Sequence, residues 1–121
     1  MAIKFDIEAV EPAQIEYGNG RVYPAIFDMR AMAYVEKKTG KGHLMLAKEL
    51  VEEEGGYSLE EIAALAAAMH RSAGVDVTDE QVLQAMNFKN YNIVGMQIVA
   101  AMIGGMPQPD EKDGEQKNAK A

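Results

Sequence analysis

The stretch Tyr23–Gly42 constrains the fold of this chain more than any other part of the sequence. An extended segment that stops at Pro24 runs into Phe27, and from there the apolar residues recur with the period of a helix. Asp28 is expected to cap this helix, because its carboxylate can accept a hydrogen bond from a first-turn amide. Gly40 is expected to end the helix in the left-handed conformation. A strand end, a cap, a helix and a stop are therefore predicted within one short stretch.

Upstream of this stretch the sequence predicts a small antiparallel sheet. Residues 3–7 alternate apolar and polar side chains, which is the pattern of a half-buried strand. The runs Ile15–Tyr17 and Arg21–Tyr23 flank Gly18–Gly20, a sequence typical of a hairpin turn. Pro24 has no N–H, which places the end of the second strand at a sheet edge that a neighbouring copy can approach.

Four further helices are predicted downstream, and capping signals begin two of them. Ser58 and Glu61 have the spacing of a capping box, and so have Thr78 and Gln81. The expected helices run from Leu44 to Glu54, from the box at Ser58 to Gly74, from the box at Thr78 through Met86, and from about Ile93 to Ile103, where Gly104 and Gly105 are expected to end the last one.

These elements predict an α+β fold that is mostly α-helical, with about five helices after the hairpin. A length of 121 residues fits one domain. We assign residues 1–107 to a single helical domain, in which the β-hairpin region occupies about residues 1–26. Residues 108–121 are expected to be a disordered tail, because they are polar and hold no apolar side chain larger than alanine from Asp110 onward.

The last helix differs from the others because Gln97 is its only clearly polar residue between Ile93 and Ile103. A helix that is apolar all round lies either at the centre of a core or against another molecule. We expect one end of it to reach an interface and the chain to form a homo-oligomer through it. The methionine-rich candidates for partner binding are Met96, Val99, Met102, Ile103 and Met106.

Composition excludes several classes of function. The net charge of −7 disfavours non-specific binding to nucleic acid. The chain has no cysteine, no secretory signal is visible, and no apolar stretch is long enough to span a membrane. Residues 21–41 are locally basic, which indicates either a contact site for an acidic partner or a solvated helix end.

No set of residues in the sequence predicts catalysis or a cofactor. His43 and His70 fall in different predicted helices without further zinc ligands at suitable spacing, so we expect surface or capping histidines. Ser58 and Ser72 lack the surroundings of a nucleophile. The glycines do not form a phosphate-binding loop. We therefore expect a protein that is not an enzyme and that binds no metal or cofactor.

The order of elements resembles the tail assembly chaperones of long-tailed bacteriophages and their prophage relatives. The resemblance rests on a hairpin, on the sequence YPAIFDMRA opening a helix that ends in EKKTGK, and on the two capping boxes. It covers roughly residues 15–104. The chain departs from the family pattern at Ala64–Ala68, where relatives often carry a tryptophan, and at Gly74–Asp76, where they often have an acidic, proline-containing linker.

This resemblance implies a non-enzymatic assembly factor in the bacterial host cytoplasm. Proteins of the family bind the tape measure protein and help to recruit tail tube subunits. A longer form of the chaperone, made by ribosomal frameshifting, is often a further partner. The family implies no catalytic residues.

Two alternatives remain open at this point. Residues 58–86 have the layout of a helix-turn-helix, which predicts a small DNA-binding regulator. The second of those helices, Thr78–Met86, carries Asp79 and Glu80 but no lysine or arginine, and phosphates would repel it. The other alternative is a generic oligomeric helical interaction protein.

Overall fold

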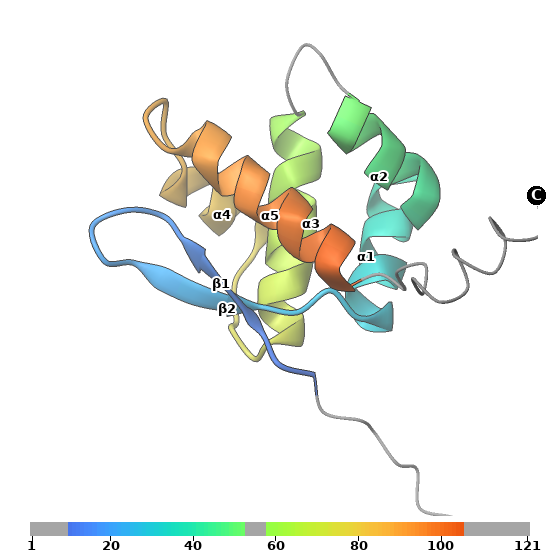
Figure 1. Cartoon of the computed structure of the whole chain (residues 1–121), viewed down its shortest axis with the longest axis horizontal. Helices are drawn as coiled ribbons and strands as arrows, with labels where there is room; N and C mark the ends of the chain where they lie inside the picture. Colours follow the sequence, from blue (N-terminus) through green and yellow to red (C-terminus); the bar gives the residue numbers. More distant parts are fainter. Residues whose placement is uncertain (1–9, 53–57, 106–121) are drawn as a thin grey trace, which may run out of the picture.

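The computed structural model of the protein describes residues 10–52 and 58–105 (Figure 1). These residues form a two-stranded antiparallel sheet and five helices, which confirms the predicted, mainly helical α+β fold. The strand expected over residues 3–7 and the tail expected over 108–121 lie outside the described residues. The elements are β1 (Ala13–Glu16), β2 (Val22–Ala25), α1 (Met29–Thr39), α2 (His43–Glu52), α3 (Leu59–Ser72), α4 (Asp79–Ala85) and α5 (Tyr91–Gly105).

The hairpin forms at the turn that the sequence predicts. β1 and β2 pair in a register that ends at Glu16 and Val22, and the amide of Tyr17 donates to the carbonyl of Arg21 at 2.8 Å. Residues 18–20 all have positive φ angles. Glycine adopts such angles without strain and asparagine tolerates them, so the Gly-Asn-Gly sequence fits this tight connection.

The outer edge of β2 is covered by α3. The carbonyl of Pro24 accepts a hydrogen bond from Nδ1 of His70 at 2.7 Å, and the amide of Ile26 donates to the carbonyl of Met69 at 2.9 Å. Pro24 therefore lies in an edge strand as predicted, but its end of the strand is bonded to α3 and is not open to a neighbouring copy. Helix α3 provides the hydrogen-bond partners that a neighbouring copy was expected to provide.

Both predicted ends of α1 are confirmed. Asp28 has an extended backbone, and its Oδ1 accepts a hydrogen bond from the amide of Ala31 at 3.0 Å. Gly40 has a φ of 73°, and its amide donates to the carbonyl of Glu36 at 2.8 Å. These two local signals position α1 directly after the hairpin.

One of the two predicted capping boxes forms completely. At the start of α4, the amides of Thr78 and Gln81 each donate to the other residue's side chain, at 3.0 and 3.1 Å. At the start of α3, Ser58 accepts from the amide of Glu61 at 3.4 Å. The Glu61 carboxylate instead accepts from Nζ of Lys41 at 2.6 Å, so it links α3 to the segment before α2.

Helix α3 is the central element of the fold. Nine consecutive residues, 62–70, are buried, and α1, α4, α5 and β2 all pack against this helix. The run Ala63–Ala68 contains five alanines, whose small side chains allow neighbours to approach from several directions. Figure 1 shows α5 crossing α3 on one face of the molecule. From the sequence, α5 is the most apolar helix, but in the structure α3 occupies the centre of the core.

Helix α5 extends further at both ends than the sequence predicts. It begins at Tyr91 and includes Gly104 and Gly105, which were expected to end it. At Gly105 a Cβ atom would lie only 2.8 Å from the carbonyl oxygen of Phe27. The last turn of α5 therefore lies tightly against the connection between β2 and α1. Among the helices of residues 10–52 and 58–105, none is long and apolar enough to cross a membrane.

Candidate partner-binding site

Helix α5 has a buried side and an exposed apolar side. The buried side comprises Val94, Gly95, Ile98, Val99 and Met102. The exposed side, which we call the α5 stripe, comprises Ile93, Met96, Ala100 and Ile103.

Two of the predicted partner-binding residues lie on this stripe and two do not. Met96 is 58% exposed and Ile103 lies at the edge of the stripe. Val99 and Met102 are buried, so the prediction that they contact a partner is wrong. Their backbone positions place them against the domain's own core. Met106 lies outside the described residues.

The α5 stripe has the spacing of a coiled-coil seam. Its members are separated by three, four and three residues, which is the alternation of a and d positions. The helix carries no charged side chain from Tyr91 to Gly105. Another helix can therefore pack on this adaptable apolar stripe without burying a charged side chain of α5.

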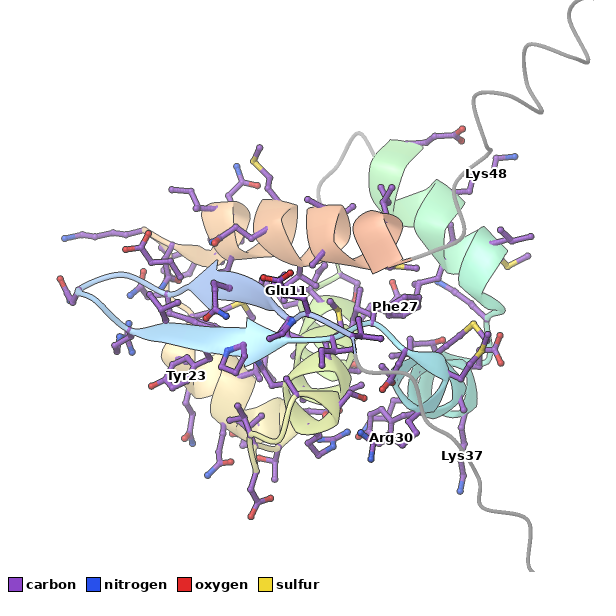
Figure 2. All side chains as sticks on the ribbon, turned by 60° about the horizontal axis from the view of Figure 1, so that its bottom comes forward. Glu11, Tyr23, Phe27, Arg30, Lys37 and Lys48 are labelled. Atoms are coloured by element: carbon purple, nitrogen blue, oxygen red, sulfur yellow. The ribbon has the colours of Figure 1, made fainter. Side chains whose placement is uncertain are left out.

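A groove adjoins the stripe at the C-terminal half of α5. This α5 groove has a volume of about 930 Å³ and is mainly apolar. Figure 2 shows Glu11 and Phe27 beside this half of α5, where β1 begins and β2 leads toward α1. The charged residues that line it are Glu11 and Asp28. Its walls come from residues 10–15, 25–29 with Met32, and Gln97, Ala100, Ala101, Gly104 and Gly105 of α5.

Gln97 fixes the hairpin against α5. Its Oε1 accepts from the amide of Glu16 at 2.9 Å, and its Nε2 donates to the carbonyl of Glu16 at 2.9 Å. The amide side chain thus pairs with β1 as a neighbouring strand would. The sequence shows Gln97 as the only clearly polar residue between Ile93 and Ile103 but gives no sign of its partner, which is 81 residues away.

Asp28 supplies a carboxylate at the edge of the groove. Besides capping α1, it accepts from Oγ of Ser72 at 2.8 Å and lies 3.8 Å from Nε of Arg30. Partial burial opposes ionisation of this carboxyl. The hydrogen bonds from Ala31 and Ser72, together with the charge of Arg30, outweigh burial and hold the pKa of Asp28 below its usual value of 3.8.

His70 is buried, which corrects the prediction of a surface or capping histidine. It is 2% exposed, and both of its ring nitrogens make hydrogen bonds. Because the Pro24 carbonyl only accepts, Nδ1 must donate to it, and Nε2 of the neutral ring then accepts from the hydroxyl of Tyr17. Burial lowers the pKa of His70, although the hydrogen bond to Pro24 partly offsets this effect. The side chain of His43 is outside the described set.

A second exposed apolar feature precedes α5. Phe88 is 97% exposed and makes an edge-to-face contact with Tyr91. The turn that carries it is held by hydrogen bonds. Oδ1 of Asn87 accepts from the amides of Lys89 and Asn90, and Nδ2 of Asn90 donates to the carbonyl of Tyr17. The turn therefore holds a phenyl ring and a lysine at a defined place beside the start of α5.

The predicted basic region over residues 21–41 is largely neutralised by ion pairs. Nζ of Lys41 lies 2.6 Å from carboxylates of both Glu49 and Glu61. Nζ of Lys38 lies 3.1 Å from Asp79, the first residue of α4. These contacts support the solvated-helix-end interpretation over an open basic face.

The helix-turn-helix hypothesis concerns α3 and α4, which pack against each other. Helix α4 presents Asp79 and Glu80 in its first turn. Asp79 also accepts a hydrogen bond from the hydroxyl of Tyr34 at 3.1 Å, which ties α4 to α1. Within residues 10–52 and 58–105, no group of three histidine or acidic residues is arranged to hold a metal ion.

The chain matches no family model, no curated protein and no solved structure. The resemblance to tail assembly chaperones consequently stays a hypothesis from the sequence. The stripe and the groove on α5 are the observations on which a functional proposal rests.

Proposed function

We propose that the protein is a non-enzymatic phage tail assembly chaperone that binds the tape measure protein and helps to recruit tail tube subunits. The observation that carries the proposal is the α5 stripe, an exposed apolar seam on a helix whose opposite side is anchored in the core. The resemblance of residues 15–104 to this family supplies the identity of the partner.

The geometry of the stripe favours a helical partner. Residues spaced three and four apart on α5 can interdigitate with an amphipathic helix of the same periodicity. A long, helix-rich protein presents such faces repeatedly before it is assembled. Covering them would keep it from aggregating, because exposed apolar surface is what drives aggregation during assembly.

The composition of the site fits a temporary rather than a permanent contact. Met96 has three rotatable bonds and a polarisable sulfur, so it can adjust to different side chains along a partner. Ala100 is small and lets another backbone approach closely. The site therefore favours adaptable binding over a single exact fit.

The test is co-purification with the tape measure protein encoded in the same genome. The variant Met96→Glu places a charge in the stripe and should abolish retention of the tape measure protein. Met45→Glu on α2 is the matched control, because Met45 is also 58% exposed. Retention should survive this control. Wild-type protein that never retains the tape measure protein, or equal effects of the two variants, would overturn the proposal.

A further inference from the structure

We propose that a second copy of this chain covers the α5 stripe, with the two α5 helices packed antiparallel about a two-fold axis that passes between them at the level of residue 98. In this arrangement Ile93 faces Ile103 of the second copy, and Met96 faces Ala100 of the second copy. The proposal assigns a self-association surface, a register and an orientation.

The register follows from the spacing of the stripe. Ile93 and Ile103 are each five residues from Ile98, and Met96 and Ala100 are each two residues from it. A two-fold axis at that level therefore superposes the stripe on itself. The longest side chain, Met96, then meets the smallest, Ala100, so the surfaces alternate large and small as interdigitating helices require.

Charge selects the antiparallel orientation. Lys89 lies just before the N-terminus of α5, and Arg21 lies at the same end, because Arg21 and Asn90 donate to the same carbonyl of Tyr17. Glu11 and Asp28 line the groove at the C-terminal end, and because Arg30 lies 3.8 Å from Asp28, the exposed Glu11 supplies most of the negative charge there. Antiparallel pairing brings the cationic end of each copy to the acidic end of the other, whereas parallel pairing would bring like charges together.

Phe88 enlarges the contact beyond the stripe. A 15-residue helix is about 22 Å long, so antiparallel pairing carries Phe88 to the end of the second helix where the groove lies. A stable interface buries about 800 Å² on each partner, more than four side chains provide. A buried aromatic residue adds about 150–250 Å². This use would explain why a fully exposed phenyl ring is held on a hydrogen-bonded turn.

Self-association would then regulate the proposed chaperone, because the second copy and the tape measure protein would cover the same stripe. This step rests on the proposed function, whereas the dimer itself does not. A chain without the tape measure protein would protect its apolar stripe in the dimer. The tape measure protein would bind only by displacing the second copy, so its apparent affinity should fall as the chaperone concentration rises.

Cysteine cross-linking tests the register directly, because the chain contains no native cysteine. We would mix Ile93→Cys with a size-tagged Ile103→Cys protein under mild oxidation. The mixed disulfide should form, since the two Cβ atoms face each other across the axis. Ile93→Cys alone should not cross-link, because in this register the two cysteines lie about 15 Å apart along the helices. Efficient cross-linking of Ile93→Cys to itself would overturn the antiparallel arrangement.

Charge exchange tests the orientation. Lys89→Glu and Glu11→Lys should each weaken the dimer in sedimentation experiments, and the double variant should recover it. Phe88→Ala should weaken it at least tenfold without changing the circular dichroism of the monomer. Met45→Glu is the control and should leave the dimer intact.

The outcomes separate this inference from the proposed function. A wild-type chain that stays monomeric at its highest soluble concentration overturns the dimer. A dimer that Met96→Glu and Lys89→Glu leave unchanged also overturns it, because another surface must then be used. A dimer with the expected cross-link that never retains the tape measure protein overturns the proposed function and leaves the dimer standing.

Discussion

The hydroxyl of Tyr17 lies 2.7 Å from Nε2 of His70 and joins the hairpin to the last turn of α3. The other ring nitrogen of His70 donates to the carbonyl of Pro24 on β2, so one imidazole bonds β2 and the residue that follows β1. Tyr17 and His70 are both buried. Because β1 forms one wall of the α5 groove, this pair also helps to set the shape of the candidate site.

Replacing Tyr17 by phenylalanine should therefore destabilise the domain. The change keeps the ring but leaves Nε2 of His70 buried without its donor, which costs about 1–3 kcal/mol. Urea denaturation followed by circular dichroism would measure it. Tyr23→Phe is the control, since Tyr23 packs edge-to-face on Tyr17 but is 40% exposed, against 2% for Tyr17, and it should change stability little. Equal effects of the two variants would contradict the role given to this hydrogen bond.

Stability should fall as the pH is lowered below about 6.5. The pKa of His70 in the folded protein is depressed, chiefly by burial, so the unfolded chain takes up a proton before the folded one does. The contribution of His70 is then complete above pH 6.5 and is lost as the pH falls toward the folded pKa. The pKa of Asp28 is depressed as well, but the stability that this carboxylate contributes is lost only as the pH falls below its usual value of 3.8.

Two measurements check this pH dependence. Denaturation midpoints between pH 5 and 8 should decline toward the acid side, and the slope should shrink in His70→Gln if that variant folds. Titration of the His70 ring by NMR in the wild-type protein gives the pKa without any variant. A value at or above 6.5 would contradict the burial argument.

The parts of the fold that the sequence predicts are those fixed by neighbours in the chain. Asp28 and Gly40 bond to residues three and four positions away, so their roles as cap and stop are visible in the sequence. His70 is different, because its partners Tyr17 and Pro24 are 53 and 46 residues distant. Its burial depends on how the hairpin packs, which no local pattern contains.

The candidate site could be predicted in part for the same reason. The apolar character of α5 indicates an interface, but the helix is apolar all round, so the sequence cannot distinguish Met96 from Met102. Only packing on α3 and the hairpin shows that Met102 is buried and Met96 exposed. The groove was not predicted because three separate segments of the chain form its walls.

Adjacent glycines at the end of α5 should respond differently to alanine. At Gly105 a new Cβ would meet the carbonyl oxygen of Phe27 at 2.8 Å, so the last turn must shift, at a cost of about 1–3 kcal/mol. At Gly104 nothing lies within 4 Å, and alanine should be neutral or stabilise the helix by up to about 1 kcal/mol. Thermal denaturation of both variants checks the difference. A destabilised Gly104→Ala protein, or an unaffected Gly105→Ala protein, would contradict the packing of this helix end.

Aspartate substitutions at the neighbouring positions Val99 and Ala100 should have different effects, because the two residues lie on opposite sides of α5. Val99 is only 7% exposed, so Val99→Asp places an unpaired carboxylate in the core. This substitution should lower the free energy of unfolding by on the order of 3–5 kcal/mol, which is a large fraction of the stability of a small domain.

Ala100 lies on the exposed stripe, and Ala100→Asp should keep the fold while it places like charges in the proposed dimer seam. Circular dichroism combined with light scattering distinguishes the two results. We expect loss of helical signal for Val99→Asp, and a helical monomer for Ala100→Asp. If Ala100→Asp unfolds the chain, then the exposed side of α5 contributes to the core. If it stays dimeric, the second copy binds elsewhere, because a carboxylate opposite Met96 in an apolar seam would lack any partner for its charge.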